Sequence, residues 1–251
     1  MTNIKILPAG DSAVSVEFGN KISPEINRRV TAAKKALEQA EIPGILETVP
    51  SFRALLVYYD PLLLPYPALE QTLLRAANTE NGEGEQPRRV FHIPVCYEGE
   101  ENAPDLPSVC AHTGLTKQEV IARHTGREYP VYMLGFLPGF AYLGGMDQAL
   151  ETPRLSTPRK KIFAGAVGIG GNQTGVYPIE SPGGWRLIGK TPVKFYAPER
   201  ENPILLQAGD AVQFFAVTQK EAKEIARLEE TGAYRITVTV SEKDSGKEPE
   251  L

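Results

Sequence analysis

The chain has 251 residues, 41% of them hydrophobic and 23% charged, which is enough for one large or two modest folded domains. Its formal net charge of −4 gives no reason to expect nucleic acid or an anionic membrane as a partner. The N-terminal segment lacks the long apolar core of a signal peptide, and no apolar run approaches membrane-spanning length. Two cysteines, Cys96 and Cys110, match neither a disulfide framework nor a metal site. We therefore expect a reduced, cytoplasmic protein without a structural metal.

Residues 1–86 predict a small α+β domain, with two helices on one face of an antiparallel sheet. Ser23, Pro24 and Glu25 form a helix start, because serine caps well and proline suits the first helical position. The predicted elements are strands at 4–7, 14–18, 46–49 and 54–59 and helices at 24–42 and 67–77. Residues 78–89 are polar and contain glycine, so they are the predicted linker.

Residues 87–240 have a different character and predict a mainly-β domain. The region between Gly135 and Gly189 holds 12 of the 23 glycines, interleaved with short apolar runs, as in a barrel or sandwich. Strands are predicted at 90–96, 193–196, 204–206, 211–217 and 234–240, and helices at 116–126 and 221–229. Residues 241–251 form a charged tail that we expect to be disordered.

Thr116 and Glu119 form a capping box, and His124 follows in the last turn of the same predicted helix. A histidine at this place is more often a cap or a partner of the helix dipole than a catalyst. We therefore interpret His124 as a structural residue.

Residues 135–145 read GFLPGFAYLGG and combine four glycines, three aromatic residues and a proline. One interpretation is a rigid aromatic loop that meets a ligand or a partner, and the other is a buried strand with bulges. An extended run would place Phe136, Phe140 and Tyr142 on one face. The candidate partner-binding residues are Gly135, Phe136, Pro138, Gly139 and Phe140.

Residues 184–191 match the phosphate-loop pattern G-x-x-x-x-G-K-[ST] literally, ending in Lys190 and Thr191. A working phosphate loop needs a strand before it and a helix N-terminus after it. Here Pro182 precedes the pattern and Pro192 follows it, ahead of a β-prone run. We interpret the match as accidental.

Polar side chains gather in the glycine-rich region and could bind a small molecule that carries a carboxylate or an amide. Arginine can hold a carboxylate through two hydrogen bonds, while amides and hydroxyls orient a polar ligand near aromatic rings. Taken singly, each such residue is more often a solvated loop side chain, and it is their concentration in one region that supports a binding site. The candidate substrate-binding residues are Arg154, Arg159, Asn172, Gln173, Ser181, Trp185 and Tyr142. No nucleophile elbow, metal motif or Ser/His/Asp arrangement is present in the sequence, so no catalytic residue is assigned.

Several longer motifs resemble the family of 5-oxoprolinase B subunits, which includes the sporulation kinase inhibitor KipI and proteins called allophanate hydrolase subunit 1. The motifs are GDSA (10–13), LLVYYDP (55–61), IPVCY (93–97), GLTKQEVIARHTG (114–126), YMLGFLPGFAYLGG (132–145), TPRLSTPR (152–159), GGNQTGVYP (170–178) and SPGGWRLIGKTP (181–192). The resemblance implies an α+β N-terminal domain followed by a cyclophilin-like β-barrel. One departure is Lys190, where the family pattern leads us to expect arginine.

The resemblance further implies a component that acts with 5-oxoprolinase subunits A and C to open 5-oxoproline to L-glutamate. ATP with Mg would be used by the complex, and the chain itself is not assigned a cofactor. On residue chemistry, Arg154 or Arg159 would hold the substrate carboxylate, and Asn172, Gln173 and Ser181 would orient the amide. One alternative is a KipI-like inhibitor that binds a sensor histidine kinase through Phe136, Pro138 and Phe140. Another is a subunit that acts on allophanate or a related urea-derived amide.

Overall fold

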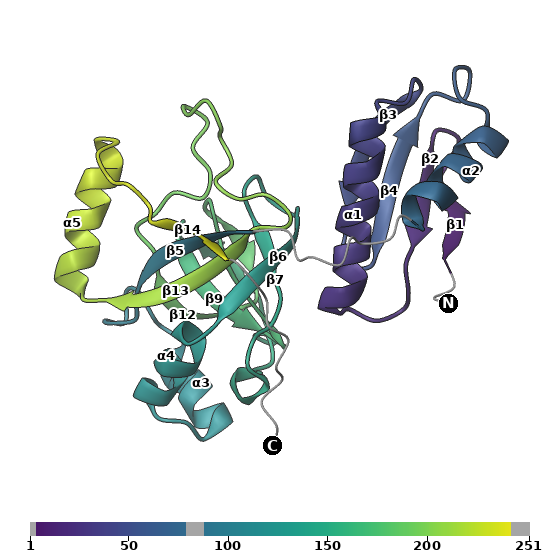
Figure 1. Cartoon of the computed structure of the whole chain (residues 1–251). Coiled ribbons are helices and arrows are strands. Elements are labelled where there is room, and N and C mark those ends of the chain that lie inside the picture. The colour runs from purple at the N-terminus through teal and green to yellow at the C-terminus, as the bar shows by residue number, and fades with distance from the viewer. Residues whose placement is uncertain (1–3, 79–87, 242–251) are drawn as a thin grey trace. The chain divides into compact units, whose positions relative to one another are not determined.

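The computed structural model describes residues 4–78 and 88–241. The chain divides into two compact units, Met1–Gln86 and Pro87–Leu251 (Figure 1). Within the described ranges, no helix is both long and apolar enough to cross a membrane.

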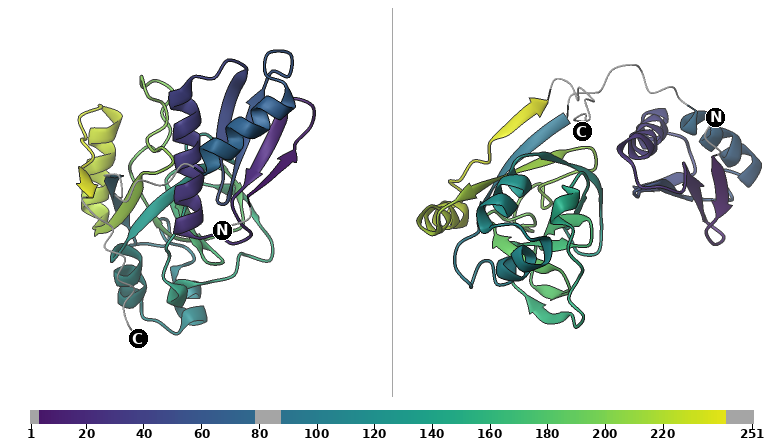
Figure 2. Two further views of the ribbon diagram at one scale, coloured as in Figure 1. Left: turned by 45° about the vertical axis from the view of Figure 1, so that its right-hand side comes forward. Right: turned by 90° about the horizontal axis from the view of Figure 1, so that it is seen from below.

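The first unit is a four-stranded antiparallel sheet with two helices packed on one face (Figure 2). Its elements are β1 (Lys5–Pro8), β2 (Ala13–Glu17), α1 (Pro24–Ala40), β3 (Ile45–Pro50), β4 (Ala54–Tyr59) and α2 (Tyr66–Ala77). The strands lie in the order β1-β2-β4-β3. Alternate residues of β2 and β4 face the helices, and burial of their aliphatic side chains against α1 and α2 forms the core. The predicted α+β layering is confirmed.

Helix α1 begins as its sequence predicts. The Ser23 hydroxyl accepts a hydrogen bond from the Ile26 N–H at 3.2 Å, and Pro24 occupies the first turn. Val30 and Leu37 lie on its buried face. The helix ends at Ala40, two residues before the predicted end, because the next residue, Glu41, takes a left-handed φ of 43°.

The second unit is built on an eight-stranded sheet in which β5 (Arg88–Cys96) pairs in parallel with β13 (Ala211–Val217). The remaining elements are α3 (Leu106–Thr113), α4 (Lys117–Thr125), β6 (Glu128–Leu134), β7 (Ala141–Leu143), η1 (Gln148–Leu150), β8 (Arg159–Ile162), β9 (Ala166–Gly170), β10 (Gln173–Val176), β11 (Ser181–Gly183), β12 (Arg186–Lys190), α5 (Gln219–Glu230) and β14 (Val238–Ser241). The sheet order is β10-β9-β12-β5-β13-β6-β7, and β14 pairs with β5 beside this path. A separate two-stranded ribbon joins β11 to β8.

The hydrogen-bonded path of this sheet is open, since β10 and β7 at its two ends are not paired in the described residues. The two strands nevertheless come close, because a Cβ on Gly175 would lie 3.3 Å from the Ala141 carbonyl oxygen. The expected mainly-β unit is therefore present as a strongly curved sheet with helices around it, while the closed barrel is not found.

Several predicted elements differ from the structure. Residues 193–196 and 204–206 form no strand, and they meet only through an isolated bridge between Tyr196 and Ile204. Arg88 and Arg89 belong to β5 rather than to the linker, and Ser241 ends β14 rather than beginning a tail. Helix α3 was not predicted. Residues 79–87 and 242–251, which hold most of the predicted linker and tail, lie outside the described residues.

The accidental nature of the phosphate-loop match is confirmed. Its central residues form strand β12, and residues 191–206 after it contain no helix. The Lys190 ammonium lies 5.3 Å from the centroid of the Phe163 ring. The segment therefore lacks the helix N-terminus that would bind a phosphate.

Candidate functional site

The loop between β6 and β7 presents one aromatic side chain to solvent. Phe136 has a left-handed φ of 69° and lies at the centre of a γ-turn, in which the Leu137 N–H donates to the Gly135 carbonyl at 2.8 Å. Its side chain is exposed, at 63%, whereas Phe140 is buried at 2%. A non-glycine residue in this conformation is strained and needs support from its surroundings.

The rest of the loop supplies that support. The Gly135 N–H donates to the Phe140 carbonyl, and the Phe140 N–H donates to the Leu137 carbonyl. Gly139 has a φ of 80°, and a Cβ there would lie 2.8 Å from the Phe195 carbonyl oxygen. The segment is therefore a tight hairpin loop rather than an extended run, so the alternation that would place the three aromatic residues on one face does not apply. Of the five candidate partner-binding residues, only Phe136 and Pro138 are exposed.

Phe140 is the centre of an aromatic cluster, which we define as Phe136, Phe140, Tyr142, Tyr177 and Trp185. The Phe140 ring makes edge-to-face contacts with the other four, at centroid distances between 5.2 and 5.7 Å. This is the preferred geometry for aromatic pairs. Two of the candidate substrate-binding residues, Tyr142 and Trp185, are far apart in the sequence but lie in this one cluster, because both contact Phe140.

Glycines make room for the indole of Trp185. A Cβ on Gly170 would overlap the indole, and a Cβ on Gly175 would lie 3.2 Å from its Cζ3 atom. Both glycines belong to the β9–β10 hairpin. Their role here is close approach of the backbone to a large side chain.

Two arginines adjoin the aromatic cluster and differ in how they are held. Arg154 is exposed, and its guanidinium carbon lies 6.0 Å from the centroid of the Trp185 ring. Arg159 is half-buried, and its Nη2 donates to Asp105 Oδ1 at 2.8 Å. Asp105 is itself fixed, because its Oδ2 accepts the Leu187 N–H at 2.7 Å. Arg154 is therefore the guanidinium available to a ligand, while Arg159 is committed in part to Asp105.

Arg159 and Ser181 lie on the two strands of the β8–β11 ribbon, where Arg159 pairs with Gly183. Arg159 Nη1 and Ser181 Oγ are buried and have no hydrogen-bond partner within the described parts of the chain. Buried polar atoms are normally paired, so unmet hydrogen-bonding capacity on both strands of this ribbon is compatible with an oxygen-bearing ligand.

Asn172 and Gln173 lie outside the aromatic cluster, at the turn between β9 and β10. Gly171, with φ of 66°, and Asn172 form this two-residue turn, and Asn172 is exposed. A backbone bridge joins Gly171 to Thr152, two residues before Arg154. The structure thus places the turn beside the Arg154 segment.

The phenol of Tyr177 was not predicted as part of the site. Burial raises the pKa of Tyr177, while a hydrogen bond from the Trp185 backbone N–H and the positive charges of Arg154 and Arg159 act in the opposite direction. Tyr177 lies in the motif GGNQTGVYP, but an aromatic residue in an apolar run carries no signal that it will face arginines. Asp105 carries no such signal either, because its partners Arg159 and Leu187 lie 54 and 82 positions away in the sequence.

His124 is buried in the core, where it is bound by Tyr97 and Thr174. This agrees with a structural role, but it corrects the expected role as a cap or charged partner of the helix dipole. Burial lowers the pKa of His124 to about 3, so the ring is neutral. The Thr174 hydroxyl donates to the Gly168 carbonyl at 3.0 Å, so its 2.8 Å contact with His124 Nε2 requires that nitrogen to donate. Nδ1 then accepts from the Tyr97 hydroxyl at 2.7 Å.

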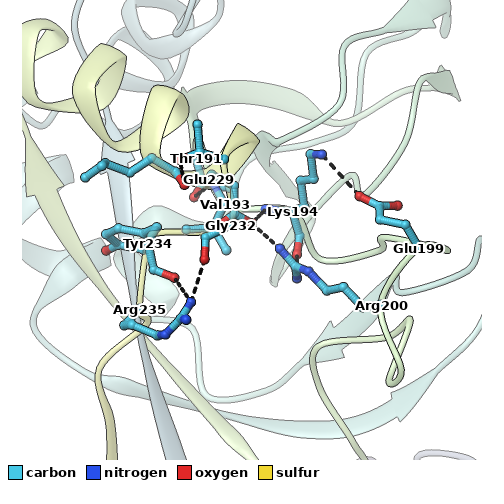
Figure 3. Close-up of polar contacts among 11 residues, drawn as sticks. Thr191, Val193, Lys194, Glu199, Arg200, Glu229, Gly232, Tyr234 and Arg235 are labelled. Atoms are coloured by element: carbon cyan, nitrogen blue, oxygen red, sulfur yellow. Dashed lines mark hydrogen bonds and ion pairs between the residues drawn. The ribbon is translucent and has the colours of Figure 1, made fainter.

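A second polar cluster surrounds Glu229 at the end of α5 (Figure 3). The Glu229 carboxylate is buried and accepts hydrogen bonds from the Lys194 backbone N–H, at 3.0 Å, and from the Arg200 guanidinium. Arg200 also donates to the Lys194 carbonyl at 3.1 Å. These contacts hold α5 to the segment after β12. Across residues 4–78 and 88–241, no three His, Cys, Asp or Glu side chains are grouped to hold a metal ion.

Residues 4–206 match the family described as carboxyltransferase domain, subdomain C and D, and the chain belongs to this family. The B subunit of 5-oxoprolinase from Bacillus subtilis (strain 168) is 43% identical over 222 residues, which cover 84% of this chain and 92% of that protein.

Solved structures agree on the fold. The crystal structure of TTHA0988 is 41% identical with a TM-score of 0.72, and the match covers 82% of this chain and 40% of that one. The chain therefore spans less than half the length of that structure. The K. lactis urea amidolyase is 22% identical with a TM-score of 0.77, over 95% of this chain and 16% of that one, and shows the fold alone.

Proposed function

We propose that this chain is the B subunit of an ATP-dependent 5-oxoprolinase, which acts with subunits A and C to open 5-oxoproline to L-glutamate. The similarity to the Bacillus subtilis B subunit over 92% of that protein carries the proposal. ATP with Mg would act at the level of the complex, and we assign no nucleotide site to this chain. We expect the isolated chain to be inactive, because its aromatic and arginine site offers binding groups rather than a nucleophile with its base.

Within the complex, the aromatic cluster and its arginines would bind the substrate. Arg154 would hold the carboxylate, since its guanidinium is exposed and steadied by Trp185. Ser181, together with Asn172 and Gln173 on the neighbouring turn, would orient the lactam amide. Ring opening develops negative charge on the amide oxygen, which fixed hydrogen-bond donors stabilise.

We also infer that the second unit is a variant of the cyclophilin-like barrel. The close approach of β7 and β10 supports this inference, because one further ladder between them would close the sheet. A cytoplasmic location fits the substrate and the composition, and it forms part of the proposal.

The test is ATP-dependent glutamate release from 5-oxoproline by the chain mixed with subunits A and C, and with each component left out in turn. Activity should require all three. Arg154→Ala should raise KM for 5-oxoproline, whereas Lys161→Ala, a cation paired with Glu180 on the surface, should leave it unchanged. Arg159→Ala should also lower activity. Wild-type rates for both arginine variants in a verified complex would refute the assigned site, and no activity in that complex would refute the enzyme assignment.

A second candidate function is KipI-like inhibition of a sensor histidine kinase, favoured by the exposed and strained Phe136. An exposed aromatic residue in a fixed loop is a typical hot spot of a protein interface. The same residue could instead contact the C subunit of the enzyme complex. Phe136→Ser should abolish inhibition of kinase autophosphorylation in the first case, and should weaken assembly of the enzyme complex in the second.

A urea-derived substrate such as allophanate is the third possibility, and it can be examined in the same assay. Replacing 5-oxoproline by allophanate and following ammonia release distinguishes the two substrates. Turnover of allophanate alone would contradict the 5-oxoprolinase proposal.

A further inference from the structure

The first unit exposes three leucines at one of its ends, and we call this set the leucine surface: Leu46, Leu62 and Leu63. Their exposed fractions are 68%, 92% and 67%, the highest among the large hydrophobic residues in the described ranges. Leu46 lies in β3, just after the α1–β3 connection, and Leu62 and Leu63 lie in the β4–α2 connection. Figure 1 shows both connections at the same end of the unit.

Backbone and side-chain hydrogen bonds hold the leucine surface in place. Asp60 Oδ1 accepts the Leu62 N–H at 2.8 Å, and the Asp60 carbonyl accepts the Leu63 N–H at 3.2 Å. The Asp60 N–H donates to the Gly44 carbonyl at 2.8 Å, which joins the two connections. The next residue, Leu64, is buried and anchors the loop in the core. Since the leucines are already ordered, a partner would bind them at low cost in conformational entropy.

The stretches of chain that carry the leucines hold acidic residues and no cation, and they are bordered by Lys35, Arg53 and Arg75, while Lys34 pairs with Glu38. Residues 36–52 and 54–74 contain no lysine or arginine. They contain five acidic residues, namely Glu38, Glu41, Glu47, Asp60 and Glu70. Glu41 and Glu47 are exposed and flank Leu46 in the sequence. An apolar patch with a carboxylate rim favours a partner with a complementary apolar patch and a basic rim.

We propose that the leucine surface docks a basic amphipathic helix of a partner protein. Protruding leucines fit the holes between the i, i+3, i+4 and i+7 side chains of a helix, and flanking lysines or arginines would face Glu41 and Glu47. The carboxylates disfavour an anionic membrane. The surface lies in the first unit, whereas the aromatic cluster belongs to the second, so this inference is independent of the proposed function.

The test uses the full chain and a synthetic helix of about 18 residues, roughly five turns, with leucine on one face and lysine on the other. Binding is followed by fluorescence anisotropy of the labelled peptide. We expect saturable binding that weakens with ionic strength, and that weakens at least about tenfold in Leu62→Ser/Leu63→Ser. The double variant should melt like the wild type, because both side chains are exposed.

Three controls make the outcome decisive. Ile22→Ser removes another exposed aliphatic side chain of the same unit and should leave binding unchanged. Glu41→Lys/Glu47→Lys should weaken binding, and the peptide with glutamate in place of lysine should bind poorly. Equal binding of both peptides, insensitivity to the leucine substitutions, or binding of the chain to phosphatidylcholine vesicles instead of the peptide would each overturn the proposal.

Discussion

Mild acid should destabilise the second unit through His124, because the folded state keeps this ring neutral. Burial lowers the pKa of His124 from 6.5 to about 3. Between these two values the unfolded chain binds a proton that the folded chain does not. The stability contributed by the neutral histidine is therefore complete above pH 6.5 and is lost as the pH falls toward 3.

The size of the effect follows from the two pKa values. Each pH unit between them costs up to about 1.4 kcal/mol, so His124 should remove about 2 kcal/mol from the free energy of unfolding between pH 7 and pH 5. That is a large part of the stability of a typical domain.

Urea denaturation across this pH range measures the effect, with His124→Phe as the comparison. The variant keeps a ring to stack on Phe214, 4.7 Å away, but cannot titrate. It should be less stable at pH 7 by about 1–3 kcal/mol, because the buried Tyr97 hydroxyl loses its acceptor. Its stability should then fall less than that of the wild type on acidification. His112→Gln, an exposed change on α3, should follow the wild-type curve. Parallel curves for wild type and His124→Phe would refute the reasoning.

Three further substitutions test the structure. Glu229→Gln should lower the free energy of unfolding by about 1–3 kcal/mol, because it removes a buried negative charge that binds the Arg200 guanidinium and the Lys194 N–H. The control Glu224→Gln, on the exposed side of α5, should change the free energy of unfolding by less than about 0.5 kcal/mol. Both values come from the same urea titration. Gly170→Ala should quench or shift Trp185 fluorescence and destabilise the unit, because its Cβ would overlap the indole; an unchanged spectrum would contradict the packing. Phe136→Gly should leave the free energy of unfolding unchanged or raise it by about 1 kcal/mol, since glycine relieves the strain of the left-handed φ. The same change should weaken binding to a partner. A clear loss of stability would show that the Phe136 ring is needed for folding.

Local chemistry made two helix starts and several elements of both units predictable. A helix start depends on residues three positions apart, so Ser23 and Thr116 could be identified as caps from the sequence, and the structure shows both. Helical and strand periodicities likewise located α1, α2, β4 and β13, because burial on one face needs only the spacing of apolar residues.

Predictions from local sequence patterns failed where contacts between distant residues determine the secondary structure. Residues 193–196 have strand-like composition, but no neighbouring strand pairs with them. Helix α3 has a weak apolar pattern and is held by packing. A strand needs a partner across space, which periodicity does not supply.

The candidate site shows the same division. Motifs in the sequence identified Tyr142, Arg154, Arg159, Ser181 and Trp185 as residues of interest, and the family followed from those motifs. Asn172 and Gln173 were grouped with them from sequence proximity, yet the fold places them on an adjacent turn.

By itself, the sequence determined the family, the helix caps at Ser23 and Thr116, the separation into an α+β and a mainly-β part, and the types of side chain available to a ligand. Only the tertiary structure decided which of those side chains are exposed and what each one contacts. Arg159 meets Asp105 across 54 positions and His124 meets Thr174 across 50, so neither contact leaves a local pattern. Burial and pairing depend on which distant segments pack together, and that information is carried by the whole chain rather than by any one stretch.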